Sequence, residues 1–136
     1  IEVVVATKDM PREDMIQAQV YGWFINTFHI NGLTSYISRF LYKHLEIDYS
    51  DFYEKLFKYI KKDKWLNEEV GSIANHYRSW TKNGRIDYSP IGKMEIHGFN
   101  LIHSTTAKIQ LDNKYEHVFD VIEKFVKETY SFDKTI

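Results

Sequence analysis

The sequence contains no cysteine and only two prolines and six glycines. Without cysteine, structural disulfides, thiolate zinc sites and cysteine nucleophiles are all excluded for these 136 residues. An absent disulfide fits a reducing compartment, so we expect a cytoplasmic protein. The glycines are scattered along the chain, and neither a phosphate-binding loop nor a dinucleotide-binding fingerprint exists.

The chain also lacks an excess of charge of either sign. Its formal net charge is −1 and its pI is near 6.7, so electrostatics give no case for binding nucleic acid or an anionic membrane. Hydrophobic residues make up 43% of the chain and aromatic residues 16%, which excludes a disordered segment. A chain of 136 residues is most simply one domain, residues 1–136, with a core of its own.

Ionic side chains are missing from one long stretch, Met15–Ser38, in which the only titratable groups are Tyr21, His29 and Tyr36. An amphipathic surface helix would carry charged residues on its outer side. We therefore expect a helix that is enclosed on most sides, as the core helix of this domain or as a face that docks on something larger. Its amides, its imidazole and its glycine argue against a membrane span, because each costs free energy in lipid.

Apolar periodicity and capping residues predict five helices. Asp9 and Pro11 are typical of a helix start, and Asn31-Gly32 supplies the left-handed turn that ends a helix. Ser50 or Asp51 is expected to cap the third helix, and Asp51 with Glu54 three residues later has the spacing of a capping box. The predicted helices span about residues 11–30, 34–45, 51–64, 67–84 and 113–130.

Three further segments favour strands. Glu2–Thr7 is rich in β-branched residues, and Lys93–His97 and Leu101–Leu111 alternate polar and apolar residues as a half-buried hairpin does. The predicted fold class is therefore α+β, mainly α, with about five helices and a small antiparallel β-hairpin or sheet. The chain begins within a predicted strand and without an initiator methionine, so we expect a C-terminal fragment of a longer protein.

The uncharged helix carries the residues that we select as candidates for substrate contact: Asn26, His29 and Asn31. Buried polar groups are normally hydrogen-bonded, so the favoured interpretation of His29 is a core histidine with a partner. The functional interpretation is a histidine that faces a substrate at an interface.

No other motif indicates catalysis. The six histidines form no H-E-x-x-H pattern, so a metal site would need ligands from distant segments, and we predict none. His97 and His103 lie on facing strands of the predicted hairpin and are the one pair that could approach. Carboxylate pairs such as Glu68-Glu69 fall at predicted helix starts, where the helix dipole explains them.

The N-terminal third of the chain resembles a known family. Residues 3–15 read VVVATKDMPREDM, and Trp23-Phe24 and Gly32-Leu33-Thr34 follow. This pattern is similar to the region C-terminal to the barrel in cobalamin-binding radical SAM proteins, including those found among polysaccharide-biosynthesis genes. In that family a Ser-Arg-Glu-Asp-Trp-like motif opens the helix. Here Pro11 and Met15 stand at the serine and tryptophan positions, so the match departs from the pattern at both ends.

The resemblance implies a parent enzyme that uses a 4Fe-4S cluster, S-adenosylmethionine and cobalamin for methylation or related radical chemistry. None of these cofactors is expected to bind this chain, because it has neither the cysteines that ligate the cluster nor the Asp-x-His-x-x-Gly pattern of cobalamin binding. The implied role is a non-catalytic C-terminal accessory domain that helps to enclose the substrate. Its partner would be the remainder of the parent polypeptide.

Two alternatives stay open. One is a stand-alone protein-interaction module or homodimerisation domain. The other is a small enzyme whose site is assembled from scattered histidines and carboxylates. An initiator methionine close to Ile1 in the coding sequence would favour the interaction module, and a C-x-x-x-C-x-x-C motif upstream would favour the accessory domain.

Overall fold

The computed structural model describes the backbone of residues 11–83 and 101–130, and the side chains of residues 11–79 and 105–130. Every regular element within these ranges is a helix. The elements are α1 (Arg12–Ile25), a π-helix η1 (Asn26–Ile30), α2 (Ser35–Leu45), α3 (Tyr49–Ile60), α4 (Lys64–Asn83), α5 (Leu101–Leu111) and α6 (Tyr115–Tyr130).

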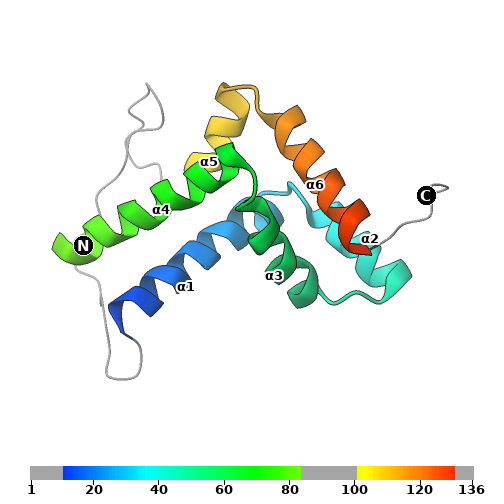
Figure 1. The fold of residues 1–136 in the computed structure, drawn as a ribbon, viewed down its shortest axis with the longest axis horizontal. Helices are drawn as coiled ribbons and strands as arrows, with labels where there is room; N and C mark the ends of the chain where they lie inside the picture. Colours follow the sequence, from blue (N-terminus) through cyan, green and yellow to red (C-terminus); the bar gives the residue numbers. More distant parts are fainter. Residues whose placement is uncertain (1–10, 84–100, 131–136) are drawn as a thin grey trace.

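Residues 15–30 of the uncharged stretch form most of α1 and all of η1, and together they make the central helix of the domain. α1 packs along α4 and also contacts α3, while η1 contacts α5 and α2. Figure 1 shows α1 and α4 running side by side in opposite directions, with α3 and α6 on the other side of the molecule. Of the two interpretations of this stretch, the core helix is confirmed for the described part of the chain.

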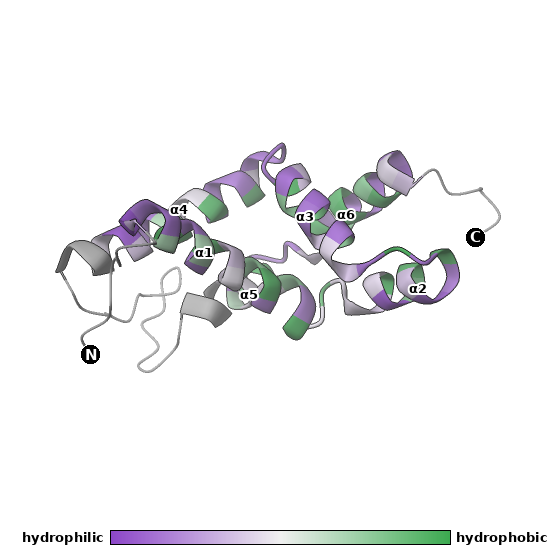
Figure 2. Cartoon of the chain, turned by 90° about the horizontal axis from the view of Figure 1, so that it is seen from below, coloured by the Kyte–Doolittle hydropathy of each residue, from purple (hydrophilic) through white to green (hydrophobic). Residues whose placement is uncertain are grey.

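Large side chains of α1 and η1 make this packing. Trp23, Phe24 and Phe28 are completely buried, and Ile16 and Val20 are each 1% exposed. Each fully buried aromatic or aliphatic side chain contributes about 1.5–3 kcal/mol to folding. These residues follow one side of the helix. The other helices in Figure 2 carry both hydrophobic and hydrophilic residues along their turns. The charged residues of α1, Arg12, Glu13 and Asp14, are confined to its exposed first turn. The absence of ions from the rest of α1 therefore reflects its contacts with helices of this same chain.

The predicted end of the first helix is confirmed. Gly32 has a φ of +93°, a left-handed conformation that glycine adopts without steric cost. The end is not a regular α-helical turn, because the N–H of Asn31 donates to the carbonyl oxygen of Asn26 at 2.8 Å, five residues back.

The fourth helix begins earlier than predicted. It starts at Lys64 rather than at Asn67, and Asp63 caps it by accepting a hydrogen bond from the N–H of Leu66 at 3.0 Å. The predicted capping box of Asp51 is also wrong, because α3 already begins at Tyr49. Local sequence placed both starts within a few residues.

The predicted α+β fold class is wrong for the part of the chain that the structure describes, where no strand or sheet occurs. Leu101–Leu111, the second strand of the predicted hairpin, is the helix α5. Thr105 and Ile109, one helical turn apart, are both fully buried, whereas Ala107, which a strand would place on the same face as both, is only half-buried. Burial therefore follows the period of a helix and not the alternation of a strand. The other two predicted strands, Glu2–Thr7 and Lys93–His97, lie outside the described residues.

The remaining predicted helices are confirmed within a few residues at each end, by α2, α3 and α6. No helix among the described residues combines the length and apolarity that a membrane span requires.

Candidate functional site

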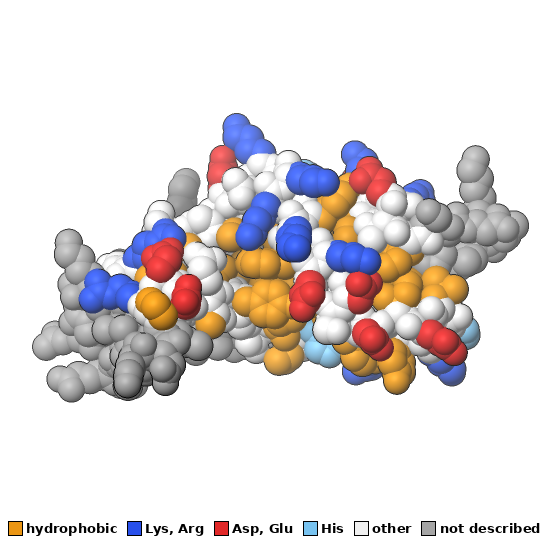
Figure 3. Space-filling model, turned by 60° about the horizontal axis from the view of Figure 1, so that its bottom comes forward, with side chains coloured by type: hydrophobic (Ala, Val, Ile, Leu, Met, Phe, Trp, Pro, Cys, Tyr) orange, Lys and Arg blue, Asp and Glu red, His pale blue; other side chains and the backbone are white. Residues whose placement is uncertain are grey.

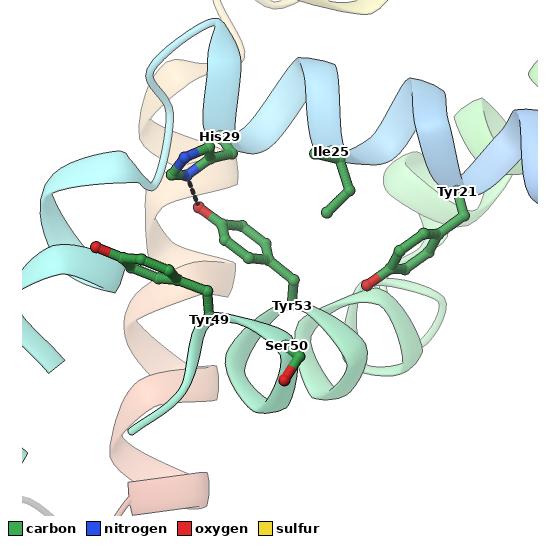
Figure 4. A pocket seen from close by; sticks show the side chains of 6 residues that line it. All are labelled: Tyr21, Ile25, His29, Tyr49, Ser50 and Tyr53. Atoms are coloured by element: carbon green, nitrogen blue, oxygen red, sulfur yellow. Dashed lines mark hydrogen bonds between the residues drawn. The ribbon is translucent and has the colours of Figure 1, made fainter. Parts of the chain in front are cut away.

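An open hollow of about 230 Å³ lies between the end of the first helix and the start of α3. The close-up in Figure 4 shows His29, Ile25 and Tyr21 projecting toward it from α1 and η1, opposite Tyr53 on α3. Aromatic rings dominate the lining, which consists of Tyr21, Ile25, His29, Tyr49, Ser50 and Tyr53.

His29 is held in the hollow by Tyr53. Its Nδ1 atom lies 2.6 Å from the Tyr53 hydroxyl oxygen, and the two rings meet edge to face with centroids 5.2 Å apart. The ring of Tyr49 lies on its other side, 5.9 Å away between centroids. Within the described residues Nε2 has no hydrogen-bond partner. One ring nitrogen is therefore fixed by the fold, and the other can meet a ligand.

The π-helical turn supplies the backbone for this arrangement. A π-turn holds one residue more than an α-helical turn, so it changes the angle at which later side chains leave the helix axis. His29 is the fourth of the five residues of η1. Such single π-turns occur frequently at functional sites.

A buried network of hydroxyl groups orients Tyr53. Its oxygen lies 3.2 Å from the hydroxyl oxygens of both Thr34 and Ser38. Ser38 also donates to the carbonyl of Ser35 at 3.0 Å, and Thr34 donates to the carbonyl of Phe28 at 2.8 Å. With those two protons committed to carbonyls, the phenolic proton of Tyr53 is directed to the Ser38 oxygen or to His29 Nδ1. Either choice fixes which tautomer of His29 is compatible with the network.

The ionisable groups of the hollow are its histidine and its tyrosines. Burial raises the pKa of Tyr53, and its hydrogen-bonding contacts with Ser38 and Thr34 offset this only in part, so the phenol stays protonated at neutral pH. No carboxylate of the described ranges lines the hollow. Figure 4 shows the side chain of Ser50 pointing away from His29, so the two do not form a nucleophile–base pair.

The three predicted contact residues do not converge. Asn26 donates from its side-chain amide to the carbonyl oxygen of Gly22 at 2.8 Å, one turn back on its own helix. Asn31 donates to the hydroxyl of Thr106 on α5 at 3.0 Å. Only His29 lines the hollow. Whether any of the three contacts a substrate stays a prediction.

Sequence reasoning missed Tyr49 and Tyr53, which α3 contributes to the hollow. Tyr53 is 4% exposed, and its partner His29 lies 24 residues earlier in the chain, with no local pattern joining them. The one usable signal was that a tyrosine on the buried side of a helix needs a partner for its hydroxyl.

A second polar network lies in the core between α1, α4 and α5. The indole N–H of Trp23 donates to Thr105 Oγ1 at 3.2 Å, and the Thr105 hydroxyl donates to Glu69 at 2.9 Å. Lys108 pairs with the other oxygen of Glu69 at 3.1 Å. The interpretation of Glu69 as a carboxylate at a helix start is therefore wrong: it is 8% exposed and holds three helices together.

No group of three or more histidine and carboxylate side chains that could hold a metal occurs among the described residues. The side chains of His97 and His103, the pair considered for a metal, lie outside the described residues. A cysteine-free chain also does not fit a 4Fe-4S cluster held by thiolates. Comparison with protein-family models, curated proteins and solved structures found no match to this chain.

Proposed function

We propose that this chain is a non-catalytic accessory domain that forms one wall of a substrate-binding site in a larger enzyme. The observation that carries the proposal is the pairing of His29 with Tyr53 at an aromatic hollow. The fold commits Nδ1 and leaves Nε2 to hydrogen-bond a ligand. The tyrosine rings offer the apolar, orienting surface that small-molecule sites typically have.

The resemblance of residues 3–34 supports the proposal that the larger enzyme is a cobalamin-binding radical SAM protein. The 4Fe-4S cluster, S-adenosylmethionine and cobalamin would then be held by the rest of the polypeptide, because this chain has no cysteine. Radical intermediates need water excluded, and a domain with an aromatic hollow at its surface can supply such a cover. A cytoplasmic location belongs to the same proposal.

The test uses the full-length parent protein with its substrate. His29→Ala removes the polar contact, and we expect KM to rise while the free energy of unfolding changes by less than about 1 kcal/mol. Lys58→Ala is the matched control, because Lys58 is exposed on α3 outside the hollow. Unchanged kinetics for His29→Ala would remove the hollow from the proposal. A parent sequence without a C-x-x-x-C-x-x-C motif would remove the radical SAM assignment alone.

The second candidate function is a protein-interaction module, and a different observation favours it. Large aromatic side chains are exposed on two helices away from the hollow: Tyr36 is 83% exposed on α2 and Phe119 is 43% exposed on α6. Exposed apolar groups that gather on one helix face are typical of a docking surface.

A further inference from the structure

α2 carries aromatic side chains on the side that faces away from the core. Its inner side is made by Ser38 and Leu41, which are 1% and 0% exposed. Tyr36 and Phe40, one turn apart, are 83% and 40% exposed. The usual surface helix has charged and polar residues in these positions.

This outer side of α2 is also positively charged. Arg39 and Lys43 are exposed on it, and no acidic residue occurs within Ser35–Leu45. Neither cation has an ion pair among the described residues. The His44 ring packs on Phe40 with centroids 4.6 Å apart. We define the α2 outer face as Tyr36, Arg39, Phe40, Lys43 and His44.

The start of α6 also exposes aromatic side chains, but the charged residues beside them are acidic. Tyr115 and Phe119 are 40% and 43% exposed, and their rings stack with centroids 6.3 Å apart. Glu116 and Asp120 are exposed beside them and have no ion pair among the described residues. We define the α6 acidic face as Tyr115, Glu116, Phe119 and Asp120. The two faces therefore match in aromatic character and are opposite in charge.

The two faces cannot meet within one molecule. In Figure 1 α6 begins next to α5 at the top, and α2 lies at the lower right. The space-filling view in Figure 3 shows hydrophobic side chains reaching the surface among charged ones on the underside of the molecule. A partner that covers both faces must come from outside.

We propose that the α2 outer face of one copy of this chain docks on the α6 acidic face of a second copy. Charge complementarity favours this contact over two symmetric ones, since α2 against α2 would bring Arg39 and Lys43 toward their own counterparts. The contact is head-to-tail, so it leaves one free face of each kind and permits further copies to add. It uses neither His29 nor the hollow, and so goes beyond the accessory role.

A charge exchange tests the proposal with the chain as it is. Variant one carries Arg39→Glu and Lys43→Glu, and variant two carries Glu116→Lys and Asp120→Lys. In each variant both faces have the same sign, so neither should associate with itself. In an equimolar mixture the acidic α2 face of variant one meets the basic α6 face of variant two. Their unchanged faces are complementary as well.

Sedimentation velocity over a concentration series measures the outcome, with circular dichroism to confirm that each variant is folded. We expect the unaltered chain to associate at low salt and less at high salt, each variant alone to lose association, and the mixture to regain it. The control, Lys58→Glu with Lys64→Glu, makes the same change in net charge as variant one but outside both faces, and it should associate like the unaltered chain. Four results would each overturn the proposal: the unaltered chain is monomeric, either variant alone still associates, the control loses association, or the mixture stays monomeric. The first of these would assign the faces to a different protein.

Discussion

The Nδ1 atom of His29 lies 2.6 Å from the hydroxyl oxygen of Tyr53, and this contact joins the π-helical end of the first helix to α3. The same hydroxyl reaches Thr34 and Ser38, so one oxygen connects three segments of the chain. Tertiary contacts of Tyr53 therefore hold one wall of the hollow in place. Its shape depends on the network that holds Tyr53.

Removing that hydroxyl should loosen the hollow. Tyr53→Phe keeps the ring but deletes the bonds to His29, Thr34 and Ser38, so we expect a loss of about 1–2 kcal/mol in the free energy of unfolding, measured with urea. Tyr49→Phe is the matched control, since the Tyr49 side chain is 39% exposed and its hydroxyl makes no hydrogen bond among the described residues. Equal losses in the two variants would show that the network does not stabilise the fold.

Deleting a hydroxyl group from the core network of Trp23, Thr105 and Glu69 should cost more unfolding free energy than Tyr53→Phe. Thr105→Val keeps the shape of the side chain but leaves the indole N–H and a buried carboxylate oxygen without partners, so we expect a loss of about 2–3 kcal/mol in the same measurement. Thr129→Val on α6 is the control, because Thr129 is only half-buried and makes no such bond to another described residue. A loss below about 0.5 kcal/mol for Thr105→Val would contradict the assigned contacts.

Thr105 also explains why a helix was mistaken for a strand. Residues four apart share a face in a helix and also in a strand, so Thr105 and Ile109 fit both, and the alternation of Leu101–Leu111 favours the strand. Only tertiary structure reveals that Trp23 and Glu69 satisfy the hydroxyl and allow it to be buried. By contrast, the end of the first helix was predictable, because Gly32 adopts its left-handed conformation for local steric reasons.

The candidate site was predictable only in part. His29 could be selected because an imidazole in an uncharged helix needs a partner. The identity of that partner depends on how α3 packs, and no local pattern of α3 marks Tyr53 for the role. Asn26 and Asn31 met the same criterion as His29, yet their amides bond to Gly22 and Thr106. Sequence identifies polar residues that need partners, but it does not say which of them face a ligand.

The cap of α4 by Asp63 predicts that the stability of the fold decreases at acidic pH. Burial by itself would raise the pKa of Asp63, but the hydrogen bonds from the Leu66 N–H and from His117 outweigh it and lower the pKa below its usual value. The stabilisation by ionised Asp63 is therefore complete above about pH 4 and is lost as the pH falls through the lowered pKa. Asp63→Ala should cost about 1 kcal/mol at pH 7, and the difference from the unaltered chain should shrink toward pH 2. A difference that is constant with pH would exclude an ionic cap.

His76 predicts a second pH dependence, nearer neutrality. Burial lowers its pKa, the positive charge of Lys108 lowers it further, and the negative charge of Glu69 acts in the opposite direction. The folded state therefore binds this proton less readily than the unfolded state. Stability is complete above the ordinary pKa of 6.5 and falls as the pH drops below it. In the His76→Gln variant, the free energy of unfolding measured with urea should change less between pH 7.5 and 5.5 than it does in the unaltered chain. The other histidines are the same in both proteins. An equal slope would contradict a folded-state penalty for the charged form.

The central claim is that the uncharged first helix is enclosed by helices of its own chain. Native-state amide hydrogen exchange on this chain tests it most directly, because amides of a core helix exchange only through global unfolding. We predict that the amides of Trp23, Phe24 and Phe28 exchange with the free energy of global unfolding measured with urea. Exchange of these amides several kcal/mol more easily than global unfolding would contradict the claim, and would show that α1 needs a partner outside this chain.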